Sequence, residues 1–372
     1  MPASRAVLTG KSALNILRKT FAQTFFQTAC KGLQEVMTTI KDVANRAGVS
    51  ISTVSHVINN SRAVSEESRQ RVEEAMAELD YQPNTLARSL RRQQTQSIGM
   101  IVPDIANPFF AEIARGIEDS SFQQNYSIIL CNSEGDLEKQ VAYTNLLIQN
   151  QVAGIVFVAA GVSTELVEDL QHREVPLVVV DRAVPRVEVN SVMTNHNQGG
   201  RLATQHLIDL GHRRIACISA GSGLSPSADR VTGYMETLWE NNMPVNKKLI
   251  MHGDFQYESG YKAAHTLLDL PEPPTAVFAC NDLMAVGCIS AAAERGLRVP
   301  QDLSVVGFDN VRLASFTNPP LTTVSQPMRQ IGTLALELLM ERINDIDSPV
   351  RIEQLDTELV VRRTTAAPRH TD

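Results

Sequence analysis

Between Ser97 and about residue 310, short apolar runs rich in Val and Ile alternate with helical stretches, and this alternation limits the possible folds more than any other feature. The first series is SIGMIVP, YSIILCN, GIVFVA and PLVVVD, and the second is RIACISA, LIMHGDF, TAVFACN and LSVVGFD. Such runs are typical of strands buried on both faces of parallel sheets. The two series predict an α/β body of two doubly wound parallel-sheet lobes. After TTVSQP we expect one more helix, from Met328 to about Asn344, and a last strand near 356–362.

A different pattern precedes this body. Apolar residues recur at helical spacing from Ile40, Thr39 and Asp42 form a capping box before them, and Gly48 ends the stretch. A second apolar stripe follows in ISTVSHVIN, and a third begins after Ser65. Two short helices joined by a tight glycine-containing turn and braced by a third predict an all-α helix-turn-helix head.

The outer face of the second helix is small and polar. Ile51 and Ser55 lie one helical turn apart, as do Ser52 and His56. Hydroxyls and an imidazole can hydrogen-bond to base edges, and Ile51 can contact a thymine methyl group. In a helix-turn-helix this face enters the major groove, so we expect it to read DNA. The alternative is a solvated helix in a small bundle.

The segment YQPNTLARSLRRQQTQ, residues 81–96, is basic and too short to form a persistent helix alone. It suits a hinge that becomes helical on DNA. Leu90 would then wedge between base pairs in the minor groove while Arg88 and Arg91 hold phosphates. The alternative is a plain charged linker.

Polar and aromatic side chains follow the apolar runs of the body. Asn107, Phe109, Asp181, Asn281 and Asp309 all stand just after such a run. The carboxyl ends of parallel strands meet at one edge of the sheet, where ligands bind in open α/β folds. Carboxylates, guanidinium groups and phenyl rings together suit a sugar, since the charged groups bind hydroxyls and the rings cover C–H faces.

Charge and composition narrow the function further. Residues 1–36 hold five basic residues and one acid, a charge of +4, and residues 37–92 hold eight basic residues and seven acids, a charge of +1. Since the net charge of the whole chain is −7, the remaining residues carry −12. An acidic body behind a neutral-to-basic front can direct that front toward a polyanion.

The five cysteines have no CxxC spacing, and no run of about 18 apolar residues occurs. We therefore expect a reduced cytoplasmic protein with no membrane segment.

The enzyme alternative depends on Asp181, Asp282 and Asp309 supplying a carboxylate pair for hydrolysis. The sequence has no GxSxG, no phosphate-binding glycine loop and no metal-ligand spacing, so we expect no catalysis, no cofactor and no metal. The spacing of His196, His206 and His212 fits no common metal site, and we expect surface or capping roles for them.

The stretch TIKDVANRAGVSISTVSHVIN followed by ARSL closely resembles the LacI/GalR family of bacterial repressors, in particular its ribose-operon and purine repressors. The resemblance runs from about Thr38 to about Arg363. It implies a body of the type I periplasmic-binding fold, whose chain crosses three times between the lobes. It also implies a homodimer on a pseudo-palindromic operator. The tail TTAAPRHTD has no leucine heptads, which favours a dimer over a tetramer.

In that family the resemblance implies that Ile51, Ser52, Ser55 and His56 read the operator, that Thr53 lies near the DNA backbone and that Leu90 is the wedge. The full set that we expect at the DNA is Thr39, Ile51, Ser52, Thr53, Ser55, His56, Asn59, Arg88, Leu90 and Arg91.

The cleft residues resemble the set that the bacterial ribose-binding protein uses, which implies ribose or a similar monosaccharide as effector. Its binding would favour a closed cleft and shift the population of the operator-bound state. The sequence leaves induction and co-repression open, and the resemblance to sugar-responsive members of the family favours induction. The alternatives are a purine-responsive repressor and a sugar receptor for transport. The purine repressor has an aromatic residue where Arg182 stands, which disfavours a stacked purine there. The expected effector residues are Asn107, Phe109, Phe110, Asp181, Arg182, Arg230, Phe255, Asn281, Asp309 and Gln326.

These readings predict a domain order. Residues 1–36 form an N-terminal extension that is disordered, a targeting peptide or, as we favour, the product of a start codon placed too early. The predicted parts that follow are the helix-turn-helix domain 37–82, the hinge and linker 83–96, an N-terminal lobe of 97–197 and 327–349, and a C-terminal lobe of 198–326 and 350–365.

Overall fold

The structure, a computed structural model, describes residues 38–59, 62–81, 95–158, 162–182, 184–221 and 225–369. It divides into two compact units, Met1–Arg88 and Ser89–Asp372. We call the described part of the first unit the head and that of the second unit the body. The expected extension, 1–36, and most of the expected hinge segment, 83–96, lie outside the described residues. No helix within the described ranges is long and apolar enough to cross a membrane.

The head consists of three helices, α2 (Ile40–Ala47), α3 (Ile51–Asn59) and α4 (Glu66–Glu78). Both hydrogen bonds of the capping box between Thr39 and Asp42 are present, which confirms that prediction. Gly48 ends α2 in the left-handed region at φ 64°, a conformation that glycine adopts without strain. The core contains Val43, Ala44, Ala47, Val54, Val57, Val72 and Ala75.

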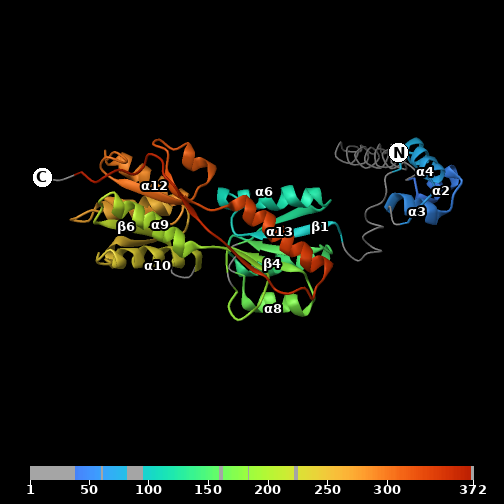
Figure 1. The fold of residues 1–372 in the computed structure, drawn as a ribbon, viewed down its shortest axis with the longest axis horizontal. Helices are drawn as coiled ribbons and strands as arrows, with labels where there is room; N and C mark the ends of the chain where they lie inside the picture. The colour runs from blue at the N-terminus through green and yellow to red at the C-terminus, as the bar shows by residue number, and fades with distance from the viewer. Residues whose placement is uncertain are drawn as a thin grey trace, which may run out of the picture. The chain divides into compact units, whose positions relative to one another are not determined.

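The body contains two lobes, each built on a sheet with helices on both faces (Figure 1). The first lobe begins with β1 (Ser97–Val102), α6 (Pro108–Gln123), β2 (Ser127–Asn132), α7 (Leu137–Gln149), β3 (Gly154–Val158), α8 (Thr164–His172), β4 (Leu177–Val180) and β5 (Ser191–Thr194).

The second lobe is formed by α9 (His196–Asp209), β6 (Ile215–Ala220), α10 (Ser225–Glu240), the short 3₁₀ helix η1 (Lys247–Leu249), β7 (Ile250–Gly253), α11 (Tyr257–Leu268), β8 (Ala276–Ala279), α12 (Asp282–Glu294), β9 (Ser304–Asp309), a second 3₁₀ helix η2 (Arg312–Ser315) and β10 (Thr322–Ser325). The chain then returns to the first lobe as α13 (Met328–Asn344) and ends with β11 (Ile352–Leu355) and β12 (Glu358–Val360).

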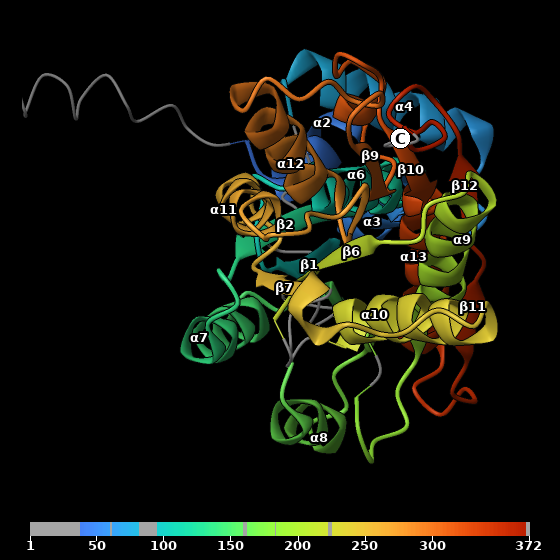
Figure 2. The same cartoon turned by 90° about the vertical axis from the view of Figure 1, so that its left-hand side faces the viewer.

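The sheet orders are β11-β5-β4-β3-β1-β2 and β12-β10-β9-β8-β6-β7. The recorded pairings are parallel except for the antiparallel pair of β10 with β12. Helices α6 and α13 cover one face of the first sheet, and α8 lies on the opposite face (Figure 1). In the second lobe, α9 packs beside α10 and α11 beside α12 (Figure 2). The predicted doubly wound lobes are therefore confirmed.

The structure differs from the expected fold in three respects. The single last strand expected near 356–362 is two short strands, and β11 pairs with β5 in the first sheet. Residues 352–355 therefore belong to the first lobe, although 350–365 was expected in the second. Strand β5, whose sequence is SVMT, was not expected at all. The chain thus crosses between the lobes between β5 and α9, between β10 and α13, and between β11 and β12.

Candidate functional site

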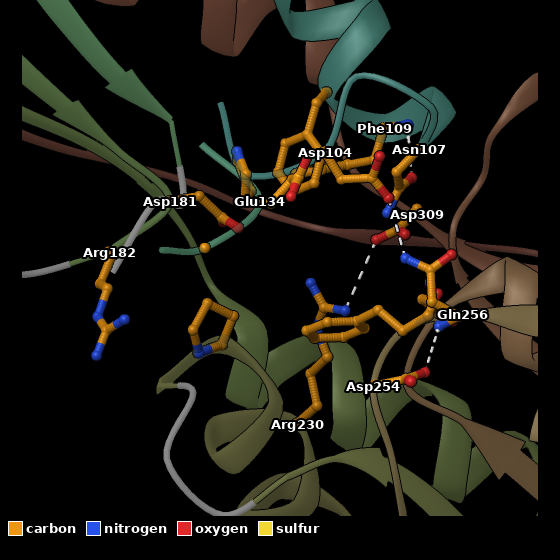
Figure 3. A pocket seen from close by; sticks show the side chains of 16 residues that line it. Asp104, Asn107, Phe109, Glu134, Asp181, Arg182, Arg230, Asp254, Gln256 and Asp309 are labelled. Atoms are coloured by element: carbon orange, nitrogen blue, oxygen red, sulfur yellow. Dashed lines mark hydrogen bonds and ion pairs between the residues drawn. The ribbon is translucent and has the colours of Figure 1, made fainter. Parts of the chain in front are cut away.

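A pocket of about 290 Å³ lies in the body at the carboxyl ends of the strands. Its lining comes from both lobes, because β1, β2 and β4 of the first sheet and β7, β8 and β9 of the second end at it (Figure 3). The lining residues are Pro103, Asp104, Asn107, Phe109, Phe110, Glu134, Gly135, Asp181, Arg182, Pro226, Arg230, Asp254, Phe255, Gln256, Asn281 and Asp309.

The loop after β1 supplies an amide and two rings. Asn107 is the N-cap of α6, and its Oδ1 accepts a hydrogen bond of 3.0 Å from the Phe109 backbone N–H. Pro108 follows at the first helical position, where its fixed φ suits a helix start. The Phe109 and Phe110 rings meet edge to face with centroids 5.1 Å apart. The cap therefore fixes two aromatic side chains at the pocket wall.

Arg230, on α10, is the central cation of the second lobe's wall and is 2% exposed. It donates to the Cys280 carbonyl, lies 3.7 Å from Asp309 Oδ1, and stands 3.8 Å above the centroid of the Phe308 ring. Figure 3 shows the Arg230 guanidinium facing Asp309, with a dashed line between the two side chains. A buried guanidinium with these partners is held in one orientation.

Asp309 ends β9 with a positive φ of 109°. Burial raises the pKa of its carboxyl to about 7, although Arg230 and a hydrogen bond from Gln326 act to lower it. Gln326 Nε2 donates to Asp309 Oδ1 over 2.8 Å. Near neutral pH this side chain can therefore hold or release a proton inside the pocket.

Asn281 lies at the end of the second sheet's central strand. Its Oδ1 caps α12 by accepting from the Met284 N–H at 2.9 Å, and its Nδ2 donates to the Phe255 carbonyl at 2.8 Å. Behind it, Asp282 is buried, and burial together with the nearby Asp309 charge raises the pKa of the Asp282 carboxyl. Asn281 thus fixes the Phe255 loop against the start of α12.

The structure brings together nine of the ten expected effector residues in the pocket lining. Gln326 is not among the lining residues. Its Nε2 donates to Asp309, and its Oε1 is buried with no hydrogen-bond partner within the described part of the chain. Figure 3 shows Arg182 at one side of the pocket, apart from the Arg230 and Asp309 pair.

Two features of the pocket region were not anticipated. His196 is 6% exposed and its Nε2 lies 2.7 Å from Asp181 Oδ1, so the expectation of a surface or capping role for it is wrong. It follows β5, the strand that the sequence did not reveal. His212 is also buried, among Thr275, Ser304 and Ala366.

The second unanticipated feature is a hydrogen bond of 2.9 Å from Gln256 Nε2 to Asp104 Oδ2, which joins the two lobes.

On the head, α3 turns Val54 and Val57 inward and leaves Ile51 48% exposed. Ser52 is exposed beside it, and Ser50 Oγ lies 2.7 Å from Ser52 Oγ and 2.8 Å from Thr53 Oγ1.

The other expected DNA contacts are only partly placed. Ser55 and His56 are half-buried on the same helix, Asn59 is its last residue, and Thr39 stands at the start of α2. The remaining three, Arg88, Leu90 and Arg91, lie outside the described residues.

A helix-turn-helix head on one chain with a bilobal body that encloses a pocket is the architecture of a transcriptional regulator. Residues 39–84 match the profile described as bacterial regulatory proteins, lacI family, and residues 204–365 match the periplasmic binding protein-like domain. The chain belongs to the LacI family of transcriptional regulators.

Several relatives carry the name HTH-type transcriptional repressor PurR. The protein of Aliivibrio salmonicida (strain LFI1238) is 40% identical over 88% of this chain and 99% of its own length. That of Aliivibrio fischeri (strain MJ11) is 42% identical over 88% of this chain and 98% of its own length.

Solved structures agree with this assignment. The lac repressor dimer bound to operator and the anti-inducer ONPF is 31% identical, with a TM-score of 0.80 over 89% of this chain and 99% of that one. A LacI family transcriptional regulator from Enterococcus faecium with bound ribose is 32% identical, with a TM-score of 0.68 over 73% of this chain and 99% of that one.

Proposed function

We propose that this chain is a transcriptional repressor that binds operator DNA as a homodimer, and whose affinity for the operator depends on a small molecule bound in the pocket of the body. The relatives named as repressors support repression, and the operator-bound lac repressor dimer supports the dimeric form. Two heads related by twofold symmetry would read the half-sites of a pseudo-palindrome.

The charge of the pocket lining supports an uncharged effector. Asp104, Glu134, Asp181, Asp254 and Asp309 are acidic, against the guanidinium groups of two arginines. Arg230 already has the Cys280 carbonyl and Asp309 as partners. A phosphate group would therefore meet more negative than positive charge, and its desolvation would go uncompensated. The many acceptor oxygens instead suit a neutral ligand that carries hydroxyl or N–H donors.

A purine base is the first candidate effector. The relatives named PurR, at 40% and 42% identity, favour it over a sugar. Hypoxanthine and guanine carry ring N–H donors for the carboxylates, and the rings of Phe109, Phe110 and Phe255 offer apolar faces to a flat base.

A pentose such as ribose is the second candidate, and one observation favours it. The buried set of Asp181, Arg230, Asn281 and Asp309 offers charge-assisted hydrogen bonds from several directions, as the vicinal hydroxyls of a sugar require. A ribose-bound regulator of the same fold is also among the similar structures.

Calorimetry with hypoxanthine, guanine, ribose and ribose 5-phosphate tests the effector assignment. We expect one neutral compound to bind, and ribose 5-phosphate to bind at least about tenfold more weakly than that compound. Operator fragments selected from a random pool, measured by fluorescence anisotropy with and without the bound compound, test the coupling. Binding of the phosphorylated sugar alone, or operator affinity that ignores a bound ligand, would contradict the proposal.

A further inference from the structure

His196 joins the two lobes by contacting one pocket residue from each of them. Asp181 follows β4 of the first sheet, whereas His196 is the first residue of α9, which packs on α10 in the second lobe. The distance from His196 Nε2 to Asp181 Oδ1 is 2.7 Å, and the two side chains are 6% and 4% exposed. A hydrogen bond shielded from water in this way is stronger than one on the surface.

The second ring nitrogen of His196 contacts Arg230. His196 Nδ1 lies 3.3 Å from both Arg230 Nε and Arg230 Nη2. A guanidinium group can only donate hydrogen bonds, so Nδ1 must accept and the imidazole proton must reside on Nε2. That proton is then donated to Asp181. The two contacts together select the neutral Nε2–H tautomer.

The network continues from Arg230 to Asp309 and ends at Gln326. Asp181, Arg230 and Asp309 line the pocket, as Figure 3 shows, whereas His196 is not among the lining residues. His196 therefore holds two pocket side chains from opposite lobes without facing the pocket itself. Its ring also lies 6.0 Å from the Phe308 ring, so a role in packing alone is the competing explanation.

We propose that His196 is a positioning residue for the effector: its two nitrogens hold the Asp181 carboxylate and the Arg230 guanidinium at a fixed spacing across the lobes. This inference rests on the proposed function of the pocket. Its chemistry requires one donor and one acceptor at position 196, and it does not require a charge. A glutamine amide offers the same pair, whereas a leucine side chain fills the space and offers neither.

Calorimetry on three variants separates positioning from packing, with hypoxanthine, guanine and ribose as probes. His196→Gln should keep the affinity of the binding compound within about threefold, and His196→Leu should lose about tenfold or more, as expected for lost hydrogen bonds to charged groups. His206→Gln is the matched control on the same helix and should match the wild type. Should His196→Leu fail to fold, His196→Ala, which also offers neither donor nor acceptor, takes its place.

Equal affinity of His196→Leu and the wild type would overturn the proposal. So would an equal loss in His196→Gln and His196→Leu, because restored hydrogen bonding would then have no effect.

A second readout needs no ligand. In a ¹⁵N spectrum of the histidine side chains of the full chain, which has eight histidines, the His196→Gln variant identifies the His196 signals. We expect the Nε2–H tautomer with an unprotonated Nδ1. An Nδ1–H tautomer, or averaging between tautomers, would overturn the proposed network. If none of the three compounds binds the wild type, the proposed effector classes fail, and this spectrum still decides whether His196 holds its two partners.

Discussion

The Gln256 side-chain amide donates a hydrogen bond of 2.9 Å to Asp104 Oδ2 and so connects the loop after β7 to the loop after β1. Both side chains line the pocket and come from different lobes. The Gln256 backbone N–H is bound in turn by Asp254 Oδ1 at 2.9 Å, which steadies the loop (Figure 3). This cross-lobe hydrogen bond joins the two walls of the pocket and therefore favours the relative position of the lobes that the structure shows.

Replacing its donor tests that role. Gln256→Glu places a second carboxylate beside Asp104, so the lobes should repel each other there. We expect effector affinity to fall by about three- to tenfold, the size of one part-buried hydrogen bond. Calorimetry measures the change. Adding Asp104→Asn restores a donor and an acceptor and should recover most of the affinity. A double variant as weak as Gln256→Glu alone would mean that these two residues do not act as a pair.

The raised pKa of Asp309 predicts a pH-dependent stability. An ordinary aspartate ionises near pH 3.8, and in the folded protein Asp309 does so at about 7. The folded state therefore binds more protons between these values, and the free energy of unfolding should fall as pH rises through this window, by up to about 1.4 kcal/mol per pH unit. Urea unfolding at pH 5 and pH 8 should show a larger loss for wild type than for Asp309→Asn. The same loss in both proteins would contradict the prediction.

The close approach of α9 to α10 predicts a strongly destabilising substitution. A Cβ on Gly200 would lie 2.1 Å from the Arg230 carbonyl oxygen, so Gly200→Ala must push the two helices apart. We expect a loss of about 1–3 kcal/mol in the free energy of unfolding, and weaker effector binding because Arg230 moves.

Arg201→Ala, on the same helix, is the control. It removes exposed ion pairs to Glu236 and Glu240 and should cost less than about 1 kcal/mol. Similar losses in the two variants would argue against a backbone clash at Gly200.

A substitution on α3 of the head should affect operator binding and non-specific DNA binding to different extents. His56 lies on α3, and truncating a base-reading side chain typically costs about 1–3 kcal/mol of discrimination. His56→Ala should therefore weaken operator binding by about tenfold and leave binding to unrelated DNA within about twofold, with salt held fixed. Fluorescence anisotropy measures both. Gln70→Ala, on the exposed face of α4, should change neither. Parallel losses on both DNAs would assign His56 a sequence-independent contact.

Much of the fold follows from the sequence because buried parallel strands and capped helices leave local signals. Runs such as LVVV are apolar throughout, and the capping box of Thr39 and Asp42 marks the start of α2. Strand β5, SVMT, is short and has a hydroxyl at each end, so it resembles a loop. The segment Ile352–Val360 has the composition of a strand, but only the packed lobes determine that its two halves join different sheets.

The pocket likewise has residues that the sequence predicts and residues that it does not. Eight of the nine predicted lining residues lie at or just after the end of a strand, and strand ends converge on one edge of a sheet whichever lobe they belong to. The ninth, Arg230, lies on α10 and was predicted from the helix after β6 and from the resemblance. The partners of His196 were not, since the contact with Asp181 depends on how the two lobes close. Gln326 was expected at the effector from its position after a crossover; its amide donates to Asp309 and it is not among the lining residues, so its contact with an effector stays a prediction.

The strands β11 and β12, encoded near the 3′ end of the gene, each cover the edge of one sheet. β11 covers the edge of one sheet at β5, and β12 covers the edge of the other at β10. A premature stop codon ahead of residue 350 would uncover both edges at once, and bare edges pair with other chains. Such a product should precipitate or be degraded, so truncation alleles of this regulator should behave as simple losses and not as dominant-negative subunits.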